Sequence, residues 1–155
     1  MKRRFLINTL VTLICAGVSV LAFAGDSLYG RVTEVKGADL VVLDYGKGQY
    51  NVRIIGVSVP KEGTFAKQAR EYVSKLVLGK NARLRFEGRN EAGEMVGRLQ
   101  TDDPEIGIKD VGLELVRSGL AQRQRDYDYK YGELAQAEAE ARRAQRGLWS
   151  ATQVK

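Results

Sequence analysis

Three short segments of β-branched and aliphatic residues follow one another in the first half of the chain, with only glycine-containing turns between them. The segments cover residues 28–36, 40–44 and 49–57, and the turns include Gly37 and Gly46. Glycine readily adopts the positive φ angles of tight hairpins, and connections this short join neighbouring antiparallel strands. The pattern therefore predicts an antiparallel meander of three strands.

The spacing of apolar residues then changes to that of a helix. Residues 65–76 carry apolar side chains at helical spacing, with Thr64 as the expected N-cap and Gly79 beyond the last turn. Residues 82–87 alternate between apolar and polar side chains, which predicts a fourth strand, and residues 94–101 are expected to form a fifth. One helix is therefore expected between the third and the fourth strand.

Two more helices are expected in the C-terminal part of the chain. The first covers residues 110–118, and the second covers residues 133–146 with a narrow apolar stripe. After Gly147, Leu148 and Trp149 are placed to fold back as a hydrophobic cap. Five strands and three helices in this order predict a closed five-stranded β-barrel of the oligonucleotide/oligosaccharide-binding (OB) type, with the helices packed outside.

Residues 1–24 have the three parts of a secretory signal peptide. Residues 2–4 are cationic, residues 5–23 are almost wholly apolar, and Ala-Phe-Ala at 22–24 is a suitable cleavage site. A permanent N-terminal anchor is the alternative, because the apolar run approaches the ~20 residues that span a bilayer. We expect cleavage, which predicts a secreted or periplasmic protein without membrane attachment and a single domain over residues 25–155.

Cleavage would leave a chain with no cysteine and no histidine, because Cys15 lies within the removed segment. Disulfides, zinc sites built from cysteine and histidine, and acid–base catalysis by histidine are thereby excluded. The formal charge would fall from +6 to +3 with the loss of three cations. This mildly basic balance is compatible with a polyanionic partner.

Short motifs follow one another in a definite order: Gly-Arg-Val-Thr-Glu-Val (30–35) with Asp39, Arg-Ile-Ile-Gly-Val (53–57) with Pro60, Gly97-Arg98, residues 113–121 and residues 141–149. In this order and over residues 30–149, the chain resembles the staphylococcal nuclease-like (thermonuclease) family. The resemblance implies hydrolysis of the phosphodiester backbone of DNA and RNA with one calcium ion. In that family two Asp side chains and a backbone carbonyl hold the ion, a Glu helps to position or activate the attacking water, and two Arg side chains bind the phosphate.

Part of this site is present in the chain. Asp39 matches the first metal-binding Asp, and Arg53 and Arg98 match the two phosphate-binding arginines. Calcium favours several hard, mostly anionic oxygen ligands, whereas Arg binds phosphate through paired hydrogen bonds. The resemblance therefore implies calcium as the cofactor if the domain is active, with Asp39 as a vestigial ligand.

The other family positions are altered. Ser58 stands in place of the second Asp, Lys61 in place of the Glu, and Val96 in place of a Tyr. Val59 could still lend its carbonyl, whereas Glu62 could replace the Glu only after a one-residue slip of the loop. The matched charges add to about +2, which favours phosphate over a divalent cation. Loss of the group that activates water commonly lowers the rate by ~10²–10⁴-fold.

Three functional hypotheses follow. The first is a secreted or periplasmic nuclease-like domain with impaired catalysis that binds a phosphate-bearing ligand, such as nucleic acid, through Arg53 and Arg98. The second is an active calcium-dependent phosphodiesterase cleaving DNA or RNA, in which Asp39 and Glu62 restore the metal centre. The third is a scaffold for a protein partner in the cell envelope, with a silent site.

Structural roles are the alternatives for the same residues. Asp39 lies in a turn, where Asp is common, and Arg98 could be a surface residue of its strand. Arg53 could cross-link strands through a carboxylate such as Asp44. These roles require no ligand.

Arg125 and Tyr127 are further candidates for contact with nucleic acid. Arg125 belongs to a set of arginines that would form a basic track or, more commonly, a solvated charged face. Tyr127 belongs to a tyrosine cluster that would stack on bases, at ~1–3 kcal/mol per base, or pack against the C-terminal helices. The two sets are Arg83, Arg85, Arg117, Arg123 and Arg125, and Tyr127, Tyr129 and Tyr131.

Overall fold

A computed structural model of the chain describes residues 27–102, 104–105, 107–129 and 132–150. Five strands form a closed barrel in the order β1-β2-β3-β6-β5, with β5 paired to β1. β3 and β6 run parallel, and the other neighbouring pairs are antiparallel. The predicted five-stranded barrel is thereby confirmed. Its strands are β1 (Ser27–Gly37), β2 (Leu40–Asp44), β3 (Gln49–Ile54), β5 (Asn81–Arg89) and β6 (Met95–Thr101).

The interior of the barrel is filled by apolar side chains from all five strands. Val32, Leu43, Val52, Leu84 and Leu99 each come from a different strand and are fully buried. Because side chains alternate between the two faces of a strand, this inward packing directs the intervening residues outward. The polar residues discussed below are therefore held on the outside of the barrel in a fixed register.

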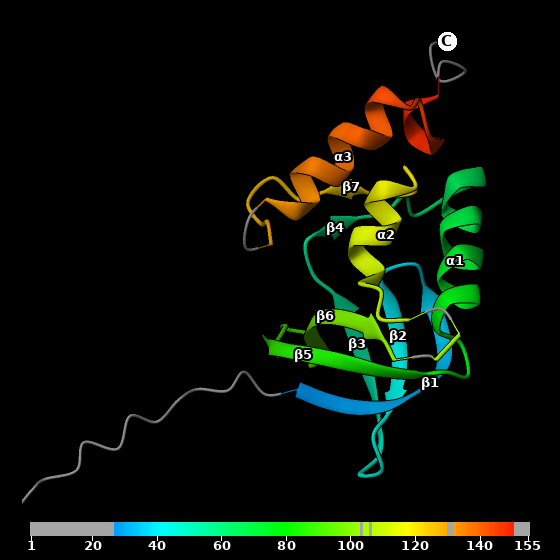
Figure 1. Cartoon of the computed structure of the whole chain (residues 1–155). Coiled ribbons are helices and arrows are strands. Elements are labelled where there is room, and N and C mark those ends of the chain that lie inside the picture. Colours follow the sequence, from blue (N-terminus) through cyan, green and yellow to red (C-terminus); the bar gives the residue numbers. More distant parts are fainter. Residues whose placement is uncertain (1–26, 103, 106, 130–131, 151–155) are drawn as a thin grey trace, which may run out of the picture.

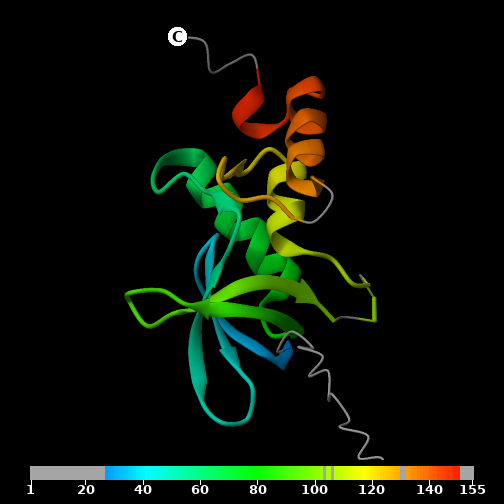
Figure 2. The same cartoon turned by 90° about the vertical axis from the view of Figure 1, so that its left-hand side faces the viewer.

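Three helices gather on one side of the barrel (Figures 1 and 2). α1 (Gly63–Val77) and α2 (Val111–Arg117) contact barrel strands and each other, whereas α3 (Glu133–Arg143) packs against α2. The 3-10 helix η1 (Gly147–Trp149) follows, and its Leu148 N–H donates to the Gly119 carbonyl at 2.8 Å. The C-terminal segment therefore folds back, as expected.

The strand predicted over residues 49–57 is wrong at its end. β3 stops at Ile54, because Gly56 turns the chain with a φ of 83°. β4 (Val57–Ser58) follows and pairs antiparallel with β7 (Gln122–Arg123), a short strand that was not predicted. This two-stranded ribbon contacts α2 and α3, so the chain leaves the barrel before it enters α1.

Two helix ends also differ from the prediction. Thr64 is not the N-cap of α1, because the helix begins at Gly63, two residues earlier than predicted, and Glu62 is the N-cap, without a side-chain hydrogen bond. α3 ends at Arg143 rather than Arg146, because Gln145 has a φ of 50° and cannot continue the helix. Both differences concern the local backbone and leave the packing of the helices unchanged.

Two expectations fall outside the described residues, namely the signal peptide at 1–24 and Tyr131. Within the ranges that the structure describes, no helix combines the length and the apolar character needed to cross a membrane. The proposed cleavage of the N-terminal segment therefore stays a prediction.

Candidate functional site

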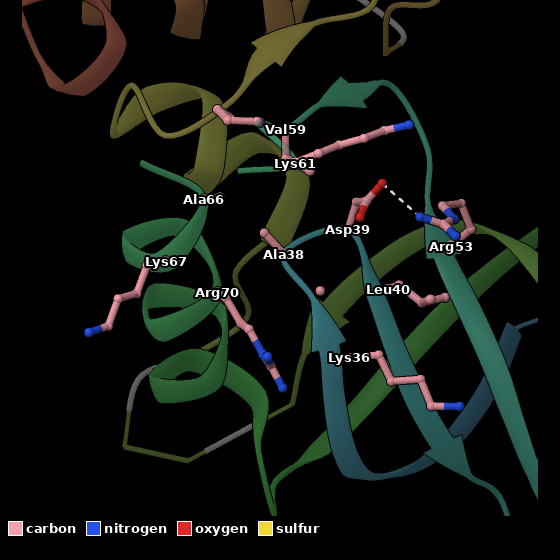
Figure 3. A pocket seen from close by; sticks show the side chains of 12 residues that line it. Lys36, Ala38, Asp39, Leu40, Arg53, Val59, Lys61, Ala66, Lys67 and Arg70 are labelled. Carbon is pink, nitrogen blue, oxygen red and sulfur yellow. Dashed lines mark hydrogen bonds and ion pairs between the residues drawn. The ribbon is translucent and has the colours of Figure 1, made fainter. Parts of the chain in front are cut away.

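A cavity of about 570 Å³ lies between the β1–β2 turn, β3, the segment after β4 and the first half of α1. Asp39 comes from the turn, Arg53 from β3 and Lys61 from the segment before α1. Figure 3 shows Asp39 joined to Arg53, with the Lys61 side chain extending along the same side of the cavity. Five cations and one carboxylate line the cavity: Lys36, Arg53, Lys61, Lys67 and Arg70, with Asp39.

Arg53 is bound by two carboxylates, and neither belongs to Asp44. Its Nη1 donates to Oδ2 of Asp39 at 2.9 Å, while Nε and Nη2 donate to Oε2 and Oε1 of Glu94 at 3.0 Å each. Arg53 does bind carboxylates of neighbouring segments, as the structural alternative suggested, but Asp44 is not one of them, because Leu40 stands opposite Arg53 and Asp44 lies at the other end of β2. The hydrogen bonds that Arg53 donates to Glu94 raise the pKa of Arg53, burial opposes the rise, and Asp39 adds to it.

Glu94 is a residue of this site that was not predicted. Its side chain is only 11% exposed, and Asn90 Nδ2 donates to its Oε2 at 2.8 Å. The hydrogen bond from Arg53, and then that from Asn90, lowers the pKa of Glu94. In the sequence, Glu94 is marked only by its position directly before β6. That position predicts a contact with Arg53 only when the pairing of β6 with β3 is known.

The other cations of the cavity form no ion pair with a carboxylate of the described residues. Lys61 and Lys67 are exposed and form no ion pair with any residue in the described ranges. Arg70 Nε donates to a backbone carbonyl of β1 at 3.1 Å, and Lys36 Nζ donates to the amide oxygen of Asn51 at 2.9 Å. Both acceptors are neutral. In Figure 3 the Lys67 side chain points away from the cavity, whereas Arg70 points between α1 and β1.

Arg98 does not line this cavity. Its Nε donates to Oδ2 of Asp110 at 2.9 Å, its Nη2 lies 3.6 Å from Glu133, and its guanidinium stacks 3.6 Å from the ring centroid of Tyr129. The pKa of Arg98 is raised overall. Burial alone would lower it, but the charge of Asp110 and the hydrogen bond to Asp110 together have the larger, opposite effect. In this arrangement Arg98 joins β6 to the starts of α2 and α3.

Of the candidate residues Ser58, Val59, Lys61 and Glu62, only two lie at the cavity. Val59 and Lys61 line it. Ser58 is exposed on β4, opposite Gln122, and Glu62 is the exposed N-cap of α1. Neither Ser58 nor Glu62 belongs to the lining of the cavity.

Arg125 lines a second cavity, of about 330 Å³, beside β7 and α3. Arg123 and Arg142 in the same cavity both lie 3.6 Å from Glu138. Arg125 itself is exposed and makes no ion pair with the part of the chain that is described. Of the two arginines of the expected basic track at this cavity, Arg123 is therefore paired with a carboxylate, and Arg125 is not paired with any described residue.

Tyr127 and Tyr129 pack against each other edge to face, with ring centroids 6.0 Å apart. The Tyr127 hydroxyl donates to Glu87 at 2.7 Å, and the Tyr129 hydroxyl donates to Asp110 at 3.0 Å. Burial raises the pKa of both tyrosines, and these carboxylates raise it further. Tyr129 is buried, so its ring is a packing element rather than a surface for stacking bases.

The comparison with known proteins places the chain in a family. The sequence profile described as "Staphylococcal nuclease homologue" matches residues 51–151, well over half of the chain. The chain belongs to the staphylococcal nuclease family. The resemblance predicted from the motifs is thereby confirmed.

Three similar proteins have names that agree with this assignment. An "Uncharacterized endonuclease" of Escherichia coli O157:H7 is 27% identical over 124 residues, which are 79% of this chain and 78% of that protein. "Probable endonuclease LCL3" of Verticillium alfalfae is 31% identical over 113 residues, 64% of this chain and 39% of that protein. "Probable staphylococcal-like nuclease CAN1" of Oryza sativa subsp. japonica is 25% identical over 128 residues, 82% of this chain and 35% of that protein. The chain therefore covers well under half of the length of the last two relatives.

The donor set of this staphylococcal nuclease homologue does not fit a calcium ion. Calcium takes six to eight oxygen ligands, several of them anionic in a tight site. Oδ2 of Asp39 and both carboxylate oxygens of Glu94 already accept hydrogen bonds from Arg53. Within the described ranges, no group of three or more His, Cys, Asp or Glu side chains could hold a metal ion. The cations around Asp39 would also oppose a divalent ion.

Proposed function

We propose that this nuclease-like domain binds the phosphate backbone of nucleic acid in the cavity beside Asp39 without calcium, and that it cleaves the backbone poorly or not at all. The observation that carries the proposal is the charge of the cavity lining: of its five cations, only Arg53 forms an ion pair with a carboxylate among the described residues. Cation–phosphate contacts supply most sequence-independent affinity for nucleic acid. Membership of a nuclease family and the names of the relatives support nucleic acid as the ligand.

Weak catalysis follows from the side chains that replace the family acids. Ser58 is a neutral and weaker oxygen donor, and Lys61 reverses the charge of the Glu that assists water. Loss of such a group lowers rates by ~10²–10⁴-fold before the loss of the metal is counted. An active calcium-dependent phosphodiesterase is the second candidate, favoured by the relatives named as endonucleases. It would need Glu62 to act from outside the cavity lining.

The proposed location is the periplasm or the exterior of the cell. Its support is the cationic, apolar and Ala-Phe-Ala pattern of residues 1–24. Mass spectrometry of the protein purified from cells that express the full chain measures the N-terminus directly. A mature form that begins at Gly25 supports secretion, and a form that retains the first 24 residues contradicts it.

The binding proposal is tested with the same purified protein and a fluorescently labelled single-stranded DNA. We expect binding in the presence of a chelator, with an affinity that falls steeply between about 50 and 200 mM salt because counterions are released. Calcium should not tighten the complex. The absence of binding in chelator, with binding restored by calcium, would contradict the proposal.

A further inference from the structure

Arg53 matches one of the two phosphate-binding arginines of the family, yet in this chain its charge is more than neutralised. Its contacts with Asp39 and Glu94 occupy three of its five N–H donors, and the three side chains together carry a formal charge of −1. A phosphate approaching Arg53 would therefore meet a net negative group. It would also have to compete with Glu94, which Asn90 holds in place.

The positive charge of the cavity comes instead from its other walls. Lys61 is exposed, has no carboxylate partner among the described residues, and extends along the side of the cavity that holds Asp39. Arg70 is anchored to β1 through Nε at 3.1 Å, and its two Nη groups make no hydrogen bond or ion pair with another residue in the described ranges. A guanidinium fixed through Nε presents its Nη donors in a set direction, which suits the oxygens of a phosphate.

We propose that Lys61 and Arg70 hold the phosphate groups of the bound strand, and that Arg53 is a positioning residue that ties the β1–β2 turn to the start of β6. This assignment rests on the proposed function and names the residues of its site. The ligand class is the phosphodiester backbone of single-stranded nucleic acid, bound by an ammonium and a guanidinium without a metal ion. Lys36 adds positive charge from β1, since its partner Asn51 is neutral.

The test measures binding of labelled single-stranded DNA in chelator as a function of salt. We expect Lys61→Ala combined with Arg70→Ala to weaken binding about ten-fold or more and to lower the salt slope by roughly 0.7 for each lost phosphate contact. Lys75→Ala is the matched control, because Lys75 is an exposed cation of α1 outside this cavity. The control should change affinity less than about three-fold, as expected of a solvent-screened charge that does not line the cavity.

A second variant tests Arg53 without changing the net charge of the protein. Arg53→Gln combined with Glu94→Gln removes one cation and one anion, and we expect its affinity for the DNA to stay within about three-fold of wild type, because the Lys61 and Arg70 contacts remain. Circular dichroism confirms that each variant is folded. The inference is overturned if wild type binds and the Lys61/Arg70 variant matches the Lys75 control, or if the folded Arg53/Glu94 variant loses binding. If wild type does not bind at all, the proposed function itself fails.

Discussion

Arg53 and Glu94 form a two-point ion pair in which Nε and Nη2 donate to both carboxylate oxygens at 3.0 Å. Arg53 belongs to β3, and Glu94 directly precedes β6, which runs parallel to β3. Parallel neighbours cannot be joined by a tight hairpin, so side-chain contacts of this kind help to fix their pairing. The pair therefore has a structural role that does not depend on any ligand.

Glu94→Gln is predicted to lower the free energy of unfolding at pH 7 by about 1–3 kcal/mol, the range for hydrogen bonds to charged groups. The pKa of Glu94 is lower in the folded state than in the unfolded state, where it is near ~4.3. Its contribution is therefore fully present above the unfolded pKa and is lost as pH falls through the folded pKa. Urea unfolding at several pH values measures the difference between wild type and variant.

Glu91→Gln is the control for this prediction, because Glu91 is an exposed acid of the same turn. It should leave stability nearly unchanged at pH 7. A Glu94→Gln effect that equals the Glu91→Gln effect, or that grows as the solution is acidified, would contradict the account.

Asp110→Ala is predicted to be among the most destabilising substitutions, at about 3–5 kcal/mol. Only 4% of the Asp110 side chain is exposed, and it accepts hydrogen bonds from Arg98, Tyr129 and the Leu113 N–H at 2.9–3.0 Å. Its removal leaves Arg98 without its closest counter-charge. Thermal unfolding measures the loss, with Asp102→Ala, at an exposed carboxylate, as the control. Equal losses in the two variants would contradict a buried network.

Gly97→Ala is predicted to destabilise the barrel by about 3 kcal/mol. A Cβ at Gly97 would meet the backbone carbonyl of Arg85 on the neighbouring strand and would lie 3.0 Å from a methyl group of Leu84. Gly37→Ala is the matched control, since a Cβ there has only ordinary contacts, the nearest at 3.5 Å. Denaturant unfolding should separate the two variants clearly, and similar midpoints would show that β6 can move to accept the methyl group.

The sequence was sufficient to predict the barrel, because its strand segments are rich in β-branched and aliphatic residues and the turns between them contain glycine. It could not predict the β4–β7 ribbon, because two-residue strands have no detectable period and Gly56 lies within an apolar run. The parallel pairing of β3 with β6 is also a property of the closed barrel rather than of either segment.

The candidate site was predicted in part. Asp39, Arg53 and Lys61 do meet at one cavity, because they flank the same turn and loop. Glu94 and Arg70 were missed, since they reach their positions only through strand order and helix placement. Arg98 lies on β6 as expected, but its partners come from the starts of α2 and α3, which no local pattern could indicate.

The central claim is that the cavity binds nucleic acid without serving as a calcium-dependent nuclease. The most direct measurement is single-turnover cleavage of end-labelled single-stranded DNA by excess protein, with calcium and with chelator in parallel. The DNA should be bound in both conditions and remain equally intact in both, since Ser58 and Lys61 replace the family acids. Cleavage that requires calcium and is abolished by Asp39→Ala would contradict the claim.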